Sequence, residues 1–199
     1  MDDEELTPTV AGLAYCAAVA TCLALSDLGR AREWTAALTS WCDGQPDAMP
    51  YRGTCLAHRA RILTAGGSWA EAMTQAEGAC AALRGPAVGL AWYELGELLR
   101  LRGDVAEAED AYRMANSSGH QPEPGLSRLR LAQGKVDAAV STLRRLVADS
   151  YREDHAEILV AYVEALLAGD DLAAAGDAVD QLDSLARALD VPVLHGRRR

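Results

Sequence analysis

The sequence contains no phenylalanine and hardly any stretch in which valine, isoleucine or threonine alternates with polar residues. Such alternation marks a half-buried β-strand, so its scarcity argues against a sheet. Alanine, leucine, glutamate and arginine, which favour the helical conformation, are abundant instead. Half of the 199 residues are apolar and 24% are charged, a balance that is typical of a folded globular chain. We therefore expect an all-α protein.

Positive charge is outnumbered, since 19 lysines and arginines stand against 29 aspartates and glutamates. The formal net charge is −10 at pH 7, and a surface with this charge repels nucleic acid. The one basic cluster, GRRR, stands at the end of the sequence, where charged residues are usually solvated. We expect residues 191–199 to form a flexible basic tail, and we expect the protein to make no direct contact with nucleic acid.

The sequence has no CxxC pair and no other cysteine spacing that is typical of a metal site. The number of cysteines is odd, and each lies in an apolar context that favours a helix. They are Cys16, Cys22, Cys42, Cys55 and Cys80. This pattern favours reduced, buried thiols and a cytoplasmic protein.

A stretch without charge, from Leu6 to Ser26, is long enough to cross a bilayer. It is rich in alanine, however, and Pro8 and Gly12 interrupt it. It also follows four acidic residues, whereas a signal peptide begins with positive charge. We expect a helix that protein covers on almost every side, and no membrane association.

Small residues recur at regular intervals along the chain. Five segments can be aligned on one alanine each, and the intervals between these alanines are 41, 36, 31 and 36 residues. The aligned residues are Ala31, Ala72, Ala108, Ala139 and Ala175. A period of about 34 residues is typical of the helix-turn-helix unit of tetratricopeptide repeats.

The segment 92–115, WYELGELLRLRGDVAEAEDAYRMA, resembles the tetratricopeptide pattern most fully. Gly96 and Ala108 leave room for two helices to cross closely, and Gly103 can end the first helix in the left-handed conformation. We predict a tetratricopeptide-like, right-handed α-solenoid of about five helix hairpins in a single domain, 1–199. The expected repeat units are 7–45, 50–84, 86–118, 122–149 and 152–190.

Several longer strings resemble the tetratricopeptide-like region of LuxR-type transcriptional regulators. They include REWTAALTSWCDGQPD at 32–47 and PYRGTCLAHRARIL at 50–63. The resemblance implies a module that receives a signal for a helix-turn-helix domain that reads DNA. The sequence has neither a GxxxxGK[ST] phosphate loop nor a basic helix-turn-helix pair, so DNA binding and nucleotide hydrolysis are not implied. The chain is either the sensor region of a longer regulator or a separate relative without the output domain.

No residues show the spacing of a known catalytic or metal site. Cys55 and His58 are three residues apart on one expected helix, but no third, orienting group follows. His155 and Glu157 form HxE without the later PCxxC of the zinc deaminases. We predict no catalytic residue, no metal and no cofactor. The alternative to a non-enzymatic module is a small all-α enzyme, for instance of a biosynthetic pathway, that reuses the repeat scaffold.

A binding groove is the remaining candidate site. In tetratricopeptide solenoids the first helix of each hairpin lines the concave face. That geometry selects His58, Arg61, Tyr93, Glu94, Glu97, Arg100, Arg128 and Glu164. Side chains of both signs with one aromatic ring suit a protein segment or a small-molecule effector better than an apolar cofactor. The alternative is that these are ordinary exposed helix residues.

The first expected helix has apolar residues on all its sides, among them Leu13, Tyr15, Val19 and Leu23. Terminal repeats normally present a polar outer face, because they cap the stack. We therefore predict that this helix is covered in a homo-oligomer. The alternative is that its many alanines form a tolerable exposed face.

Overall fold

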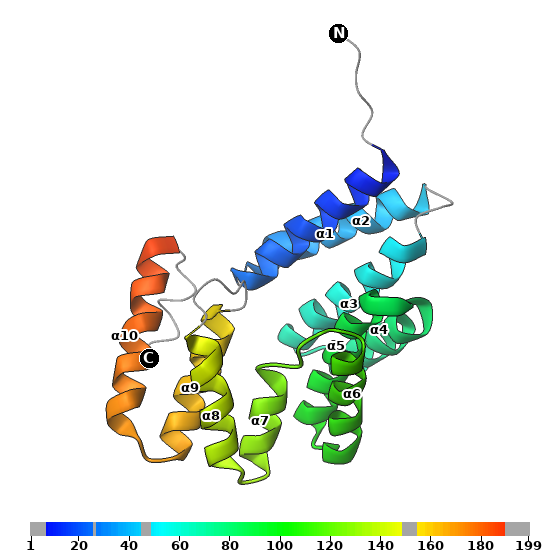
Figure 1. Cartoon of the computed structure of the whole chain (residues 1–199). Coiled ribbons are helices and arrows are strands. Elements are labelled where there is room, and N and C mark those ends of the chain that lie inside the picture. Colours follow the sequence, from blue (N-terminus) through cyan, green and yellow to red (C-terminus); the bar gives the residue numbers. More distant parts are fainter. Residues whose placement is uncertain (1–6, 26, 45–48, 149–154, 190–199) are drawn as a thin grey trace. The chain divides into compact units, whose positions relative to one another are not determined.

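The computed structural model describes residues 7–25, 27–44, 49–148 and 155–189. Within these ranges the chain forms ten α-helices, one short 3₁₀ helix and no strand, which confirms the all-α prediction (Figure 1). The elements are α1 (Pro8–Ala24), α2 (Leu28–Asp43), α3 (Met49–Ala65), α4 (Trp69–Ala82), η1 (Gly85–Ala87), α5 (Val88–Arg102), α6 (Val105–Ser117), α7 (Gly125–Ala132), α8 (Val136–Val147), α9 (His155–Ala168) and α10 (Leu172–Leu189). None of the described helices has the length and apolar character needed to cross a membrane.

Contacts divide the chain into two compact units. Unit 1 comprises Met1–Leu23 and Asp27–Gln121 and contains α1 to α6. Unit 2 comprises Ala24–Ser26 and Pro122–Arg199 and contains α7 to α10. The range that the sequence analysis treats as one domain therefore consists of two units. Each expected repeat range holds two successive helices to within one residue, and the predicted basic tail lies outside the described residues.

In unit 1, α5 and α6 cross where the sequence places its small residues. Gly96 faces the ring of Tyr112 so closely that a Cβ on residue 96 would lie 2.7 Å from Tyr112 Cδ1. Ala108 and Ala115 are fully buried on the same side of α6. Gly103 ends α5 with φ +90°, a conformation that glycine adopts without steric cost. The roles predicted for Gly96, Ala108 and Gly103 are confirmed.

The hairpin of α3 and α4 is built on the same principle. Ala60 of α3 and Ala72 and Ala76 of α4 have no exposed surface. They form one apolar cluster with Leu98 of α5, and Met73 packs against that cluster. Small residues at the centre and larger ones around them therefore close the space between α4 and α5.

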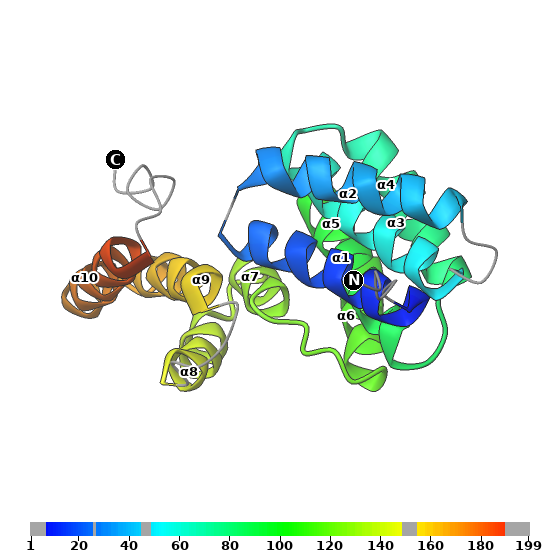
Figure 2. The ribbon, with the colours of Figure 1, turned by 90° about the horizontal axis from the view of Figure 1, so that it is seen from above.

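Large side chains connect α1 and α2 to α3. The ring centroid of Tyr15 is 6.0 Å from that of Trp34 and 5.9 Å from that of Trp41. Trp41 in turn lies 5.9 Å from Tyr51 of α3. The Tyr51 ring sits against Gly12, where a Cβ would lie 2.6 Å from the ring carbon Cζ. Figure 2 shows α1 and α2 running alongside one another. The contacts of Tyr15 join α1 to α2, and the contact of Trp41 with Tyr51 joins α2 to α3.

Unit 2 has a core formed by α8, α9 and α10. Its buried members are mostly small or branched aliphatic residues: Ala139, Leu143, Ile158, Ala161, Tyr162, Ala165, Leu166, Ala175 and Ala178. The last two aligned alanines of the sequence repeat thus occupy this core. In the turn between α9 and α10, Asp170 adopts φ +58°, a left-handed conformation that aspartate tolerates better than most residues.

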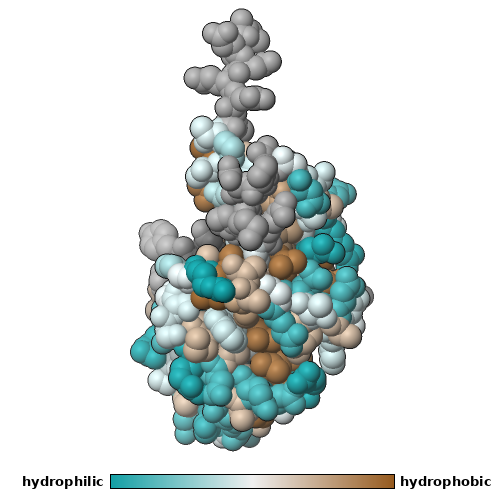
Figure 3. All heavy atoms as spheres, turned by 90° about the vertical axis from the view of Figure 1, so that its right-hand side faces the viewer, coloured by the Kyte–Doolittle hydropathy of each residue, from teal (hydrophilic) through white to brown (hydrophobic). Residues whose placement is uncertain are grey.

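The surface seen from one side carries both hydrophilic and apolar residues. Figure 3 shows the side that faces right in Figure 1, with hydrophilic residues mainly along its margins and lower end and apolar residues between them. Isolated apolar residues are normal on a protein surface.

Candidate functional site

Four of the predicted groove residues share one position in the repeat. Arg61, Glu97, Arg128 and Glu164 each stand 11 residues before the aligned alanine of their own hairpin. They lie on α3, α5, α7 and α9, which are the first helices of four successive hairpins. The charge alternates in sign from one hairpin to the next. The repeat therefore places one ionisable group at the same register on four helices.

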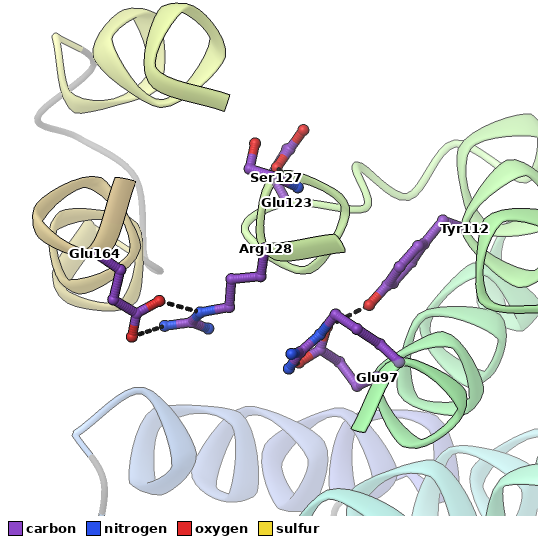
Figure 4. Close-up of polar contacts among 7 residues, drawn as sticks. Glu97, Tyr112, Glu123, Ser127, Arg128 and Glu164 are labelled. Atoms are coloured by element: carbon purple, nitrogen blue, oxygen red, sulfur yellow. Dashed lines mark hydrogen bonds and ion pairs between the residues drawn. The ribbon is translucent and has the colours of Figure 1, made fainter. Parts of the chain in front are cut away.

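On α5, the carboxylate of Glu97 is held by two neighbours. Arg100 donates to it from Nε at 3.2 Å and from Nη2 at 2.9 Å. The hydroxyl of Tyr112 on α6 donates to Glu97 Oε1 at 2.5 Å (Figure 4). The side chains of Arg100 and Glu97 are only 18% and 16% exposed. This cluster ties α5 to α6 next to the contact between Gly96 and Tyr112.

Burial and charge shift the pKa values in this cluster. Burial, together with the negative charge of Glu97, raises the pKa of Tyr112 far above its usual range. Burial by itself would lower the pKa of Arg100, but hydrogen bonding and attraction to Glu97 outweigh it and raise that pKa. Tyr112 therefore stays a neutral donor and Arg100 stays charged.

Three other predicted groove residues are packed inside unit 1. Tyr93 is 8% exposed, and its ring centroid lies 6.1 Å from that of Tyr112 and 5.2 Å from that of His120. Glu94 is 4% and His58 is 6% exposed. Burial, followed by the positive charge of Arg61, lowers the pKa of His58 to about 4. These three side chains offer little surface to a ligand in this conformation.

In unit 2 two of the predicted groove residues, Arg128 and Glu164, form an ion pair between α7 and α9. Arg128 of α7 donates to Glu164 of α9 from Nε at 2.8 Å and from Nη2 at 3.4 Å (Figure 4). The two side chains are 22% and 47% exposed, so a partner can reach them. Nearby on α7, the backbone N–H of Ser127 donates to Glu123 Oε2 at 3.0 Å. Glu123 therefore accepts a hydrogen bond in the first turn of α7.

Cys55 and His58 are not arranged as a nucleophilic pair. The Cys55 sulfur lies 3.1 Å from Thr39 Oγ1 of α2, and burial raises the pKa of its thiol. Since burial also lowers the pKa of His58, both groups favour their neutral forms. Among the described residues, no group of three or more His, Cys, Asp or Glu side chains is placed to hold a metal ion.

The residues predicted for self-association differ in how far they are buried. Val19 and Leu23 are buried in a cluster with Ala31 and Ile62. Tyr15 is half-buried in the aromatic contacts with α2. Leu13 alone of the predicted set is well exposed, at 59%.

A cavity of about 510 Å³ that the sequence did not predict lies in unit 1, between α2 and α3. Residues of both helices line it, among them Arg32, Ala36 and Ser40 of α2 and Arg59 and Leu63 of α3. A usable signal was Arg32, which follows an aligned alanine at the position where α4 has the apolar Met73.

Comparison with known families identifies the repeat. The sequence profile of the tetratricopeptide repeat family matches residues 59–120 and 125–188, more than half of the chain. Together with the helix hairpins, this match confirms the predicted fold class, an α-solenoid of tetratricopeptide-like hairpins. No curated protein matches the sequence.

Proposed function

The chain belongs to the tetratricopeptide repeat family, and from this premise we propose that it is a non-enzymatic module that binds a segment of a partner protein. Repeats of this kind commonly mediate contacts between proteins, since stacked hairpins present an extended row of side chains. The observation that carries the proposal is the charged position shared by Arg61, Glu97, Arg128 and Glu164.

Within unit 2, the positive Arg128 and the negative Glu164 favour a partner with a complementary charge pattern. Of the two glutamates at the shared charged position, Glu164 is the more exposed, at 47% against 16% for Glu97. An exposed ion pair contributes little to stability, so a partner can compete for either group at small cost. This pair is therefore the contact that a partner segment engages first.

Selection of peptides tests the proposal. A random peptide library displayed on phage is selected on the full chain, and the affinity of the enriched peptides is measured by fluorescence anisotropy. Arg128→Glu should weaken their binding by about tenfold, because it replaces attraction by repulsion.

The matched control is the exchanged variant Arg128→Glu with Glu164→Arg, which keeps an ion pair between α7 and α9 while reversing the charge pattern. It should retain the helical circular-dichroism spectrum and lose the selected peptides. The proposal is wrong if no peptide is enriched, or if binding is indifferent to all four charged positions. A small-molecule effector, the other ligand class considered, would give the first of these outcomes.

We also propose that the chain self-associates through the outer side of α1. Val10 and Leu13 are 47% and 59% exposed, and Ala14 and Ala17 are exposed beside them. These positions form one apolar stripe at helical spacing. Sedimentation at micromolar concentration should show a species heavier than the monomer, and Leu13→Glu should convert it to monomer. A wild-type chain that sediments only as a monomer would rule this association out.

We infer a sensor role related to LuxR-type regulators from the resemblance of the strings at 32–47 and 50–63. A gene for a helix-turn-helix protein next to the gene for this chain would support that role. A neighbouring biosynthetic cluster without such a gene would favour the enzyme alternative.

A further inference from the structure

The cavity between α2 and α3 has the size of a binding site. Its volume of about 510 Å³ lies within the range of about 300–1,000 Å³ that is usual for small-ligand pockets. It is formed by unit 1 alone and lies between the second helix of one hairpin and the first helix of the next. The shared charged position of Arg61, Glu97, Arg128 and Glu164 contributes no residue to its lining.

The cavity stays open because α2 lacks the side chain that would fill it. In α4, the residue after the aligned Ala72 is Met73, which packs against the apolar cluster at the α4–α5 interface. In α2, the residue after the aligned Ala31 is Arg32, which is exposed. One turn further along α2 stands Ala36, whose side chain is too short to reach across.

Three charged side chains line the cavity: Arg32 and Asp43 of α2 and Arg59 of α3. Among the residues that the structure describes, neither Arg32 nor Arg59 forms an ion pair, whereas Arg100 and Arg128 pair with glutamates. The two arginines outnumber the one aspartate, so the lining carries a positive excess in a chain whose net charge is −10. Their guanidinium groups are suited to bind carboxylates, often through two hydrogen bonds each.

The remaining lining suits a chain segment. Ile62 and Leu63 supply an apolar wall from α3, and Ser40 supplies a hydroxyl from α2. Arg32 lies at the end of α3, where a Cβ on Gly66 would come within 3.0 Å of its Nη2. Glycine at position 66 therefore leaves room for the guanidinium at the rim of the cavity.

We propose that this cavity binds an acidic segment of a partner protein, with carboxylates on Arg32 and Arg59 and an apolar side chain on Ile62 and Leu63. This inference rests on the proposed function as a protein-binding module, and it adds a second contact surface with defined chemistry. The charge complementarity of the two arginines with a carboxylate selects the occupant.

Titration with defined peptides tests the inference. The probe is a fluorescein-labelled peptide of alternating glutamate and leucine, and the full chain is titrated against it in fluorescence anisotropy. Saturable binding is expected, and Arg32→Ala with Arg59→Ala should weaken it at least about tenfold. A peptide of alternating lysine and leucine should not bind.

Two further variants separate charge from shape. Arg113→Ala with Arg145→Ala removes the same total charge from exposed positions elsewhere and should leave the affinity within about twofold of wild type. Ala36→Trp fills the cavity without a change of charge and should abolish binding while the helical circular-dichroism spectrum is retained. If the Arg113 and Arg145 variant lost as much affinity as the Arg32 and Arg59 variant, the inference would be wrong, because the peptide would then be attracted by the net charge of the chain alone.

Succinate distinguishes a peptide segment from a small carboxylate. If succinate displaces the peptide at similar concentration, the occupant is a small dicarboxylate and the inference is wrong. Failure of the glutamate–leucine peptide to bind also overturns it. If the phage-selected peptides still bind through the charged position of α7 and α9, the proposed function survives that failure, and the two claims are thereby told apart.

Discussion

Two hairpins of unit 1 are built in different ways. The α5–α6 hairpin brings two helices together on small residues, with Gly96 against the ring of Tyr112 and Ala108 fully buried. The α1–α2 hairpin relies on large rings, since Tyr15 contacts both Trp34 and Trp41. Small residues allow two helices to pack closely, whereas aromatic rings bridge helices and leave space between them unfilled. The open cavity lies beside the second kind of hairpin.

The largest effect is expected where the close-packed hairpin loses its central ring. Tyr112 is 1% exposed, so Tyr112→Ala should lower the free energy of unfolding by about 3–5 kcal/mol. Tyr15→Ala in the aromatic hairpin should cost less, about 1–2 kcal/mol, because this ring is only half-buried. Urea denaturation followed by circular dichroism measures both. Equal losses would remove the distinction between the two hairpins.

The next effect concerns His58, which lies on α3 between the two hairpins. Its folded-state pKa of about 4 is below the ordinary value of 6.5, so the unfolded chain binds a proton more readily. The contribution of the neutral His58 to the free energy of unfolding is therefore fully present above pH 6.5, and it is lost as the pH falls toward 4. The loss should reach about 3 kcal/mol. Urea denaturation at several pH values should show a shallower decline in His58→Gln, and an unchanged slope would contradict the buried neutral histidine.

Two glycine-to-alanine substitutions should change the stability in opposite directions. Gly96→Ala should destabilise by about 1–3 kcal/mol, since the new Cβ would press on the Tyr112 ring. Gly176→Ala in α10 meets nothing within 4 Å and should stabilise by up to about 1 kcal/mol through helix propensity. Thermal unfolding of the two variants should shift in opposite directions. A gain at Gly96 would show that the α5–α6 contact is looser than described.

A smaller loss is expected from the hydroxyl alone. Tyr112→Phe keeps the ring but removes the hydrogen bond to Glu97, at a cost of about 1 kcal/mol. The difference between Tyr112→Phe and Tyr112→Ala then measures the contribution of the ring. If Tyr112→Phe lost as much stability as Tyr112→Ala, the hydrogen bond of the hydroxyl, and not the packing of the ring, would account for the contribution of Tyr112.

The smallest effect belongs to the exposed pair of unit 2. Arg128→Ala should change the free energy of unfolding by less than about 1 kcal/mol, because Glu164 is 47% exposed and solvent screens the pair. The same substitution should weaken the binding of selected peptides clearly. Stability and binding measured on one variant thus separate a structural role from a role in recognition.

Much of the fold could be read from local patterns. The left-handed Gly103 and the buried Ala108 and Ala115 follow from helix geometry within one hairpin. The candidate site was harder to predict. The repeat geometry put Arg128 and Glu164 on first helices but did not predict their ion pair. It also gave no sign that Tyr93 and His58 would be packed inside unit 1. A helix pattern tells which residues share a face, and it does not tell how much of that face a neighbouring helix covers.

The outer helix shows the same limit. The sequence presented Leu13, Val19 and Leu23 as equivalent apolar residues, and the structure buries the last two while it exposes the first. The division depends on Ala31 and Ile62, which come from two other helices and complete the cluster around Val19. No local pattern contains that information.

The sequence by itself determined the helices, their pairing in hairpins and the charged position that recurs on four of them, because small residues and turn glycines act within about one repeat. Tertiary structure alone decided which of those side chains remain accessible and where a cavity is left between α2 and α3. The physical reason is that burial and free volume arise from the fit of side chains that come from different helices, and that fit is fixed only when the helices pack.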